Sequence, residues 1–158
     1  YNTNLKMNPP LRLASDAAAL RAGVADGSID CIVTDHAPHA AHEKDCEWEI
    51  AFFGTIGLET SLPLMLTNMV LPGKLDWDAL VNLMAVNPRR ILRLDPVKVE
   101  AGSVADLTLI DPEAKVEVTE DYFESKSKNP AFLGETLTGA ASDVFVSGKR
   151  KLADGQLA

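Results

Sequence analysis

The chain has 158 residues, of which 46% are hydrophobic and 24% are charged, and its formal net charge is −8 at pH 7. This size and composition fit one folded domain with a real core and exclude the disordered and fibrous classes. The acidic balance argues against nucleic acid as a partner, and the longest apolar stretches are too short for the roughly 20 residues of a membrane helix. The only cysteines, Cys31 and Cys46, are predicted to be reduced thiols of a cytoplasmic protein.

The first predicted elements are a proline-rich turn, a helix and a buried strand. Two prolines after Asn8 stiffen the turn, so Asn8 is either presented to a ligand or simply leads into the helix. Ser15 and Asp16 cap a helix predicted over 16–26, and the short apolar run at 29–34 is typical of a strand buried on both faces. A helix followed by such a strand is the unit of a parallel sheet or barrel.

Asp35 follows the predicted strand, with His36 and His39 close behind it in the sequence. In parallel α/β folds the C-terminal tip of a strand is the mouth of the active site. A carboxylate held there beside imidazoles can bind a divalent metal ion or take a proton from water. The equally open alternative is a helix-capping Asp followed by a turn, because Asp is common beside turns that contain proline.

The connection from 36 to 57 is long for a loop, and long loops in compact domains are usually functional. Phe53 and Gly54 offer an aromatic wall beside a residue without a side chain, where a flat ligand could reach the backbone N–H. A hydrophobic plug under the loop is the alternative. His42 and the charged residues of this loop are predicted to be solvated.

The rest of the chain changes from helices to strands near residue 95. One core helix is predicted over about 57–68, with Pro63 marking its first turn. A second is predicted after Asp76 and a third from Asn87. Their predicted packing residues are Leu80, Leu83, Met84, Ile91, Leu92 and Leu94. Beyond Pro96, short alternating segments predict β-strands at 97–99, 105–110, 116–118 and 144–146, the last paired in a hairpin with 149–152.

Three motifs stand in order along the chain: Lys-Met-Asn-Pro-Pro-Leu-Arg within 1–12, Asp-His-Ala-Pro-His within 30–39, and Phe-Gly-Thr-Ile-Gly-Leu-Glu-Thr at 53–60. Together with segments 102–109 and 129–148, they closely resemble the bacterial class I dihydroorotases of the amidohydrolase superfamily. The second motif is closer to dihydroorotases than to hydantoinases or allantoinases. Phe52 departs from the family, which commonly has Pro before Phe-Gly.

The resemblance implies a zinc enzyme, with one or two ions, that reversibly hydrolyses dihydroorotate to N-carbamoyl-aspartate in pyrimidine biosynthesis. It implies that Asp35 is a metal ligand and the catalytic residue that shuttles the proton of the attacking water. Asn8 and His39 are expected to bind polar atoms of the substrate, and Phe53 and Gly54 to contact its ring through the main chain. His36 is left as structural.

The resemblance also implies an α/β fold in two parts. Residues 1–95 are expected to form the C-terminal part of a TIM-like (β/α)8 metal-dependent hydrolase barrel, with the last barrel strand at 29–34, and residues 96–158 a β-rich domain with strands of a small β-sandwich. The family's other zinc ligands come from earlier barrel strands and are not found in this sequence. The chain, which starts at Tyr1, is therefore interpreted as a cut C-terminal portion that is inactive without the N-terminal half of the same enzyme.

Two other functions remain open. One is a non-catalytic dihydroorotase-like scaffold for aspartate transcarbamoylase, and retention of Asn8, Asp35 and His39 favours the active enzyme over it. The other is a hydantoinase acting on related rings. A homo-oligomer is expected in the dihydroorotase reading.

Overall fold

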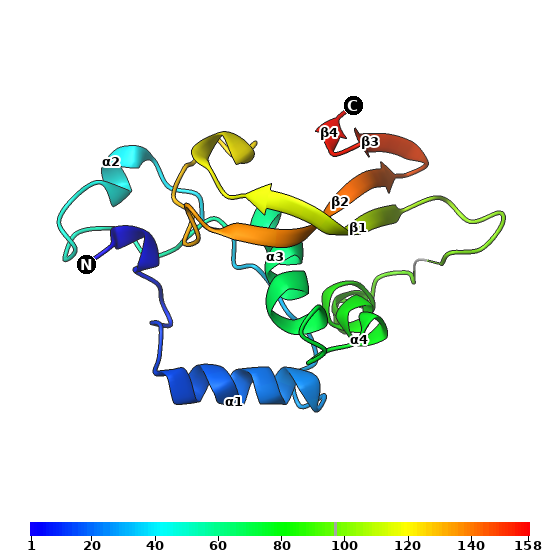
Figure 1. Ribbon diagram of the computed structural model, residues 1–158, viewed down its shortest axis with the longest axis horizontal. Coiled ribbons are helices and arrows are strands. Elements are labelled where there is room, and N and C mark those ends of the chain that lie inside the picture. Colours follow the sequence, from blue (N-terminus) through cyan, green and yellow to red (C-terminus); the bar gives the residue numbers. More distant parts are fainter. Residues whose placement is uncertain (97) are drawn as a thin grey trace. The chain divides into compact units, whose positions relative to one another are not determined.

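The computed structural model describes residues 1–96 and 98–158 and has a mixed α/β architecture that includes a four-stranded sheet (Figure 1). The helices are α1 (Ala14–Ala25), α2 (Ala41–Lys44), α3 (Leu58–Met65), α4 (Trp77–Val81) and α5 (Asn87–Ile91). Short 3₁₀ or π-helical turns are η1 (Thr3–Leu5), η2 (Leu66–Val70), η3 (Asn82–Val86) and η4 (Glu120–Tyr122), and the strands are β1 (Leu107–Glu117), β2 (Thr136–Val146), β3 (Lys149–Ala153) and β4 (Gln156–Leu157). None of the helices in the described part of the chain has the length and apolar character of a membrane span.

The chain forms two compact units. The first unit combines 1–61 with 117–136, and the second combines 62–116 with 137–158. This grouping differs from the predicted boundary near 95, because the segment 117–136 packs with the N-terminal residues.

The core of the first unit joins segments that lie far apart in the sequence. Ile56, Val118 and Phe123 are buried, and Ile56 forms a parallel bridge with Pro130. Removing such apolar side chains from water is the main force that holds 117–136 against the first 61 residues.

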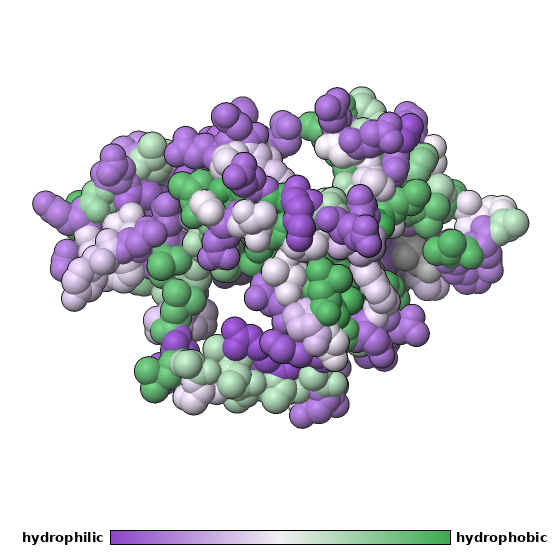
Figure 2. Space-filling model, viewed as in Figure 1, coloured by the Kyte–Doolittle hydropathy of each residue, from purple (hydrophilic) through white to green (hydrophobic). Residues whose placement is uncertain are grey.

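Helix α1 has no buried residue. Figure 2 shows a band of apolar residues along it at the lower edge of the view, and Leu13 and Leu20 are 73% and 60% exposed. The predicted cap is corrected in detail: the Asp16 carboxylate accepts a hydrogen bond from the N–H of Leu13, so the helix starts at Ala14. Gly27, at φ +81°, follows its end as predicted.

The strand predicted over 29–34 is not formed among the described residues. Val33 is 74% exposed, although the prediction placed this run in a core buried on both faces. An apolar β-branched run supplies the propensity for a strand, but a strand also needs a neighbouring strand to hydrogen-bond. No such neighbour pairs with this segment within residues 1–96 and 98–158.

Helices α3, α4 and α5 follow the predicted order with two corrections. Leu66, Leu80 and Leu83 are buried, as the predicted apolar face requires. Helix α3 begins at Leu58, so Pro63 lies inside the helix and does not mark its first turn. The predicted core residues Ile91, Leu92 and Leu94 are 54%, 67% and 52% exposed, because helical spacing identifies an apolar face but not whether another element covers it.

The sheet has the order β1-β2-β3-β4. The predicted hairpin is confirmed: β2 and β3 pair antiparallel, and Ser147 and Gly148 form the tight turn with φ of +51° and +76°. Residues 107–110 and 116–117 of the segments predicted at 105–110 and 116–118 belong to one strand, β1, and residues 105, 106 and 118 lie outside it. The strand predicted at 97–99 includes residue 97, which lies outside the described residues, and residues 98 and 99 are not in a strand.

Candidate active site

A cavity of about 290 Å³ in the first unit brings together four of the five predicted site residues. Asn8, Asp35, Phe53 and Gly54 line it, with Met7, Pro9, Thr34, Ala37 and Thr55. The three motifs of the sequence thus meet at one concave surface. A small pocket with a carboxylate, an amide and an aromatic ring can orient a small polar ring compound.

Asp35 is exposed, and its backbone φ is +44°. This left-handed conformation is unusual for a residue with a side chain, and Asp and Asn tolerate it better than most. Two residues later, the N–H of Ala37 donates to the carbonyl of Thr55 at 2.9 Å, which ties the Asp35 turn to the opposite wall of the cavity. The carboxylate is therefore held at the cavity by a fixed turn.

Asn8 lies in the proline-rich turn, where the Asn8–Pro9 peptide bond is cis. Two residues before Asn8, the carbonyl of Lys6 accepts a hydrogen bond from the N–H of Gly54, at 2.8 Å. This main-chain contact places Asn8 beside Phe53 and Gly54.

Gly54 can only be glycine in this structure. Its φ is +124°, and an added Cβ would lie 2.5 Å from the Cβ of Ala37. Its N–H already donates to Lys6, so the expectation that a ligand reaches this N–H is corrected. Any ligand contact at this wall must use other groups, such as the ring of Phe53. Phe53 is 54% exposed.

His39 is the predicted site residue that does not line this cavity. Its Nε2 lies 2.9 Å from the carbonyl oxygen of Phe53, so Nε2 carries the proton and donates. Its Nδ1 lies 3.6 Å from a carboxylate oxygen of Glu43. His39 instead lines a larger cavity, of about 630 Å³, with Asn4, Asp45 and Asn129 among its other lining residues.

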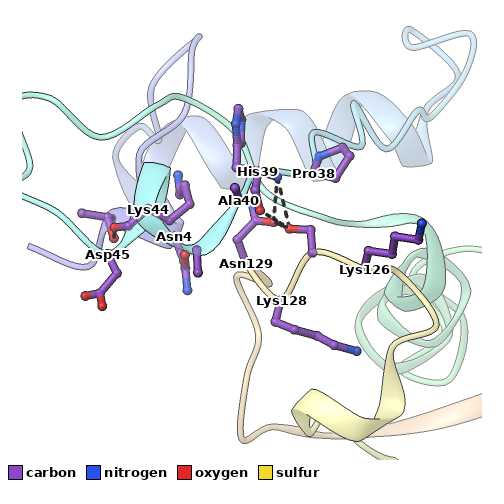
Figure 3. A pocket seen from close by; sticks show the side chains of 12 residues that line it. Asn4, Pro38, His39, Ala40, Lys44, Asp45, Lys126, Lys128 and Asn129 are labelled. Carbon is purple, nitrogen blue, oxygen red and sulfur yellow. Dashed lines mark hydrogen bonds between the residues drawn. The ribbon is translucent and has the colours of Figure 1, made fainter.

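Figure 3 shows His39 beside Asn129 in this larger cavity, with Lys126 and Lys128 extending away from them. The lysines are exposed, and Lys128 donates to the carbonyl of Phe123 at 2.6 Å. Because Nε2 of His39 already donates to the Phe53 carbonyl, the smaller cavity, which holds the exposed carboxylate of Asp35, is the better candidate.

His36 has a structural role, as the sequence suggested. Its Nδ1 accepts hydrogen bonds from the N–H groups of Gly57 and Leu58, at 3.1 and 3.3 Å. These N–H groups belong to the start of α3 and have no partner inside the helix. The imidazole therefore caps α3 and fixes the turn that follows Asp35.

Asn129 is an organising residue that sequence reasoning missed. It is 3% exposed, and its side-chain amide donates to the carbonyls of Ala37 (3.2 Å) and Gly54 (3.4 Å). Its own carbonyl accepts from the Thr55 hydroxyl at 2.8 Å. Ser127 adds a donor to the carbonyl of His39 at 2.8 Å. The one available signal was an Asn-Pro pair inside the β-rich tail, which reads as an ordinary turn.

The charged residues of the 36–57 loop are not all solvated, which corrects the prediction. Lys44 is 4% exposed, and burial, followed by the nearby charge of Lys6, lowers the pKa of its ammonium group. Outside this loop, Tyr122 has a pKa shifted in the opposite direction: burial, followed by the charge of Glu59, raises the pKa of its phenol. Carbonyl groups of the loop supply the hydrogen bonds that make a buried lysine possible.

The described residues could supply one ligand to a zinc ion but not a complete site. Asp35 offers one carboxylate, and no group of three or more His, Cys, Asp or Glu able to hold a metal occurs in residues 1–96 and 98–158. The neighbouring imidazoles are engaged, His36 with the start of α3 and His39 with Phe53. A catalytic zinc ion needs about three protein ligands.

The model of the amidohydrolase family matches residues 3–151. The chain belongs to the amidohydrolase family. It is 54% identical over 149 residues to the dihydroorotase of Geotalea daltonii, covering 94% of this chain and 35% of that protein. It spans about a third of the length of the curated relatives it matches.

Solved amidohydrolase structures have the same fold over nearly the whole chain. The L-hydantoinase (dihydropyrimidinase) of Arthrobacter aurescens is 32% identical with a TM-score of 0.84, covering 97% of this chain and 35% of that one. The D-hydantoinase of a Thermus species is 26% identical with a TM-score of 0.86, covering 99% and 35%. These likenesses support the amidohydrolase fold, and the dihydroorotase is the more similar in sequence.

Proposed function

We propose that this chain is the C-terminal portion of a dihydroorotase that reversibly hydrolyses dihydroorotate to N-carbamoyl-aspartate in pyrimidine biosynthesis. The observation that carries the proposal is the cavity that gathers Asn8, Asp35, Phe53 and Gly54 in a chain 54% identical to a dihydroorotase. "Complete enzyme" below means this chain together with the remaining two thirds of the dihydroorotase sequence.

Ring opening requires water to add to the amide carbonyl, the C–N bond to break, and a proton to reach the leaving nitrogen. The Asp35 carboxylate at the cavity can accept the proton of the attacking water and return it to that nitrogen. The Asn8 amide can bind polar atoms of the anionic substrate, and the Phe53 ring can lie against the substrate ring. His39 donates a hydrogen bond to the main-chain carbonyl of Phe53 and so affects substrate binding indirectly, through the position of Phe53.

The remaining parts of the proposal concern what surrounds the site. In the complete enzyme, residues 1–95 contribute the end of a TIM-like (β/α)8 barrel, with 29–34 as its last strand, and residues 96–158 contribute a β-rich domain. Segment 29–34 pairs with no strand within residues 1–96 and 98–158, and its Val33 is exposed, which is consistent with a strand whose neighbours lie in that other part of the sequence. Asp35 would be one zinc ligand, and the rest would come from outside this chain. A cytoplasmic homo-oligomer, with aspartate transcarbamoylase as a further partner, completes the proposal.

A hydantoinase is the second candidate, because two solved structures of the same fold, at 32% and 26% identity, are hydantoinases. Assays of the complete enzyme with dihydroorotate, N-carbamoyl-aspartate and hydantoin separate the candidates. We expect turnover of the first two and little of the third. Preference for hydantoin would replace the proposal, and no turnover of any of them would favour the non-catalytic scaffold.

A further inference from the structure

Four consecutive main-chain carbonyls beside the candidate site each accept a hydrogen bond from a side chain. Ala51 accepts from Lys6, Phe52 from Lys44, Phe53 from His39, and Gly54 from both Lys44 and Asn129. This segment is in neither a helix nor a strand, so it has no ladder to satisfy its carbonyls. Side chains from elsewhere in the first unit take that role.

Lys6 donates one of these hydrogen bonds, to Ala51, and two more to carbonyls just before the segment. It is 8% exposed, and its Nζ donates to the carbonyls of Trp48 (2.7 Å), Glu49 (3.0 Å) and Ala51 (2.7 Å). These three hydrogen bonds use all three N–H donors of the ammonium group. The same Nζ lies 4.7 Å from the centre of the Phe53 ring, a cation–π contact with a residue that lines the cavity.

Lys44 approaches the same segment from α2. Its Nζ donates to the carbonyls of Phe52 (2.8 Å) and Gly54 (2.9 Å), so it spans Phe53. Neither Lys6 nor Lys44 forms an ion pair with a carboxylate within residues 1–96 and 98–158. Carbonyl dipoles thus stabilise both buried cations, with the Phe53 ring as a further contact of Lys6, and this arrangement is stable only if those carbonyls keep their positions.

We propose that Lys6 and Lys44 are positioning residues of the active site, whose buried ammonium groups set the main-chain geometry of Phe53 and Gly54 and thereby the affinity for the substrate ring. The inference rests on the proposed function, since it assigns these residues a role in that reaction. Neither lysine lines the cavity beside Asp35. Their effect on the substrate is therefore indirect, through the wall that they hold.

The test compares Lys6→Met and Lys44→Met with Lys74→Met in the complete enzyme. Met keeps the length of the stem and removes the donors, and Lys74 is an exposed lysine of the second unit. The first readout is KM against kcat for dihydroorotate. We expect KM to rise about tenfold in each buried-lysine variant while kcat stays within about threefold, the pattern of lost binding. Lys44→Gln, which keeps an N–H donor and is milder for folding, should lie between the parent and Lys44→Met.

The second readout needs no substrate. Hydrogen exchange at the Gly54 amide, bonded to Lys6, and at the Phe52 amide, bonded to Glu43, should become at least about tenfold faster in both Met variants and not in Lys74→Met. Unchanged exchange overturns the inference, as does a fall in kcat with unchanged KM. If the parent enzyme does not hydrolyse dihydroorotate, the proposed function is refuted. Hydrogen exchange at the Gly54 and Phe52 amides then still decides whether the two lysines position the loop.

Discussion

Gly54 lies so close to Ala37 that a Cβ added to Gly54 would be 2.5 Å from the Cβ of Ala37. Replacing Gly54 with Ala should therefore cost both backbone strain at φ +124° and a steric clash, about 3 kcal/mol of unfolding free energy in total. Gly27→Ala is the matched control, because Gly27 also has a positive φ, +81°, but open space around it. Urea denaturation should give a clearly smaller loss for the control. Equal losses would mean that the close contact with Ala37 is relieved by small shifts.

Asp35→Asn should leave folding intact and reduce the turnover of the complete enzyme by about 10²–10⁴-fold. Asn tolerates the left-handed backbone of Asp35 as well as Asp does, so the change removes the carboxylate and little else. Steady-state kinetics beside a thermal denaturation profile measure the two effects separately. Turnover within a few-fold of the parent would exclude Asp35 as the proton carrier.

Asn8 and His39 are expected to differ, because only Asn8 lines the cavity with Asp35. Asn8→Ala should weaken substrate binding by about 1.5–3 kcal/mol, the loss of a hydrogen bond to a charged ligand. His39→Ala should act through the freed carbonyl of Phe53, so His39→Gln, which retains a donor, should recover part of the loss. If His39→Gln were as defective as His39→Ala while the loop stayed intact, His39 would contact substrate directly.

Tyr122 makes stability depend on alkaline pH. Its hydroxyl donates to the carbonyl of Glu59 at 2.9 Å, and its pKa is raised above the ordinary 10.0. The phenol therefore stabilises the folded state fully below pH 10, and this contribution is lost as pH rises through the raised pKa. The pKa of Lys44 is lowered, so its protonation destabilises the folded state, and this loss of stability is removed as the pH rises toward its ordinary pKa of 10.5.

Denaturation of the parent and of Tyr122→Phe between pH 8 and 11 separates the two groups, since Lys44 is common to both proteins. At pH 8 the variant should be less stable by about 1 kcal/mol, one hydrogen bond. The difference should shrink as the pH rises. A difference independent of pH would show that Tyr122 titrates normally.

The isolated 158-residue chain should neither bind zinc tightly nor hydrolyse dihydroorotate. Asp35 is one potential ligand, and a catalytic zinc ion needs about three. The chain should also self-associate, because α1 carries exposed apolar side chains such as Leu13 and Leu20. Metal analysis, an activity assay and light scattering measure all three properties. A monomeric, zinc-loaded and active chain would contradict this prediction.

Much of the site could be predicted because it depends on local sequence. The proline-rich turn at Asn8, the residue after the apolar run and the Phe-Gly pair are each defined by a few neighbours, and the structure brings all three to one cavity. The hairpin around Ser147 and Gly148 was predictable for the same reason, since a two-residue turn fixes its own register.

The failures share a different cause. Whether 29–34 becomes a strand depends on a neighbouring strand, and whether Ile91 is buried depends on a covering element, neither of which is encoded in the segment itself. The burial of Lys6 and Lys44 could not be predicted. Lys6 depends on carbonyls more than 40 positions later in the sequence, and Lys44 depends on carbonyls of an irregular loop. Periodicity detects apolar faces but has no signal for a polar network.

The bonds from Asn129 to Ala37 and Gly54 span 92 and 75 positions of sequence, and the first unit includes residues up to 136. Synthesis as far as residue 61 of this sequence therefore supplies every residue that lines the cavity in the described part of the chain, but not Asn129, which holds the cavity walls together. Contacts of such long range close late, after the loop entropy of the intervening chain has been overcome. The binding site is consequently among the last parts of the first unit to mature, and a chain shortened before residue 129 would retain all three motifs while failing to assemble them.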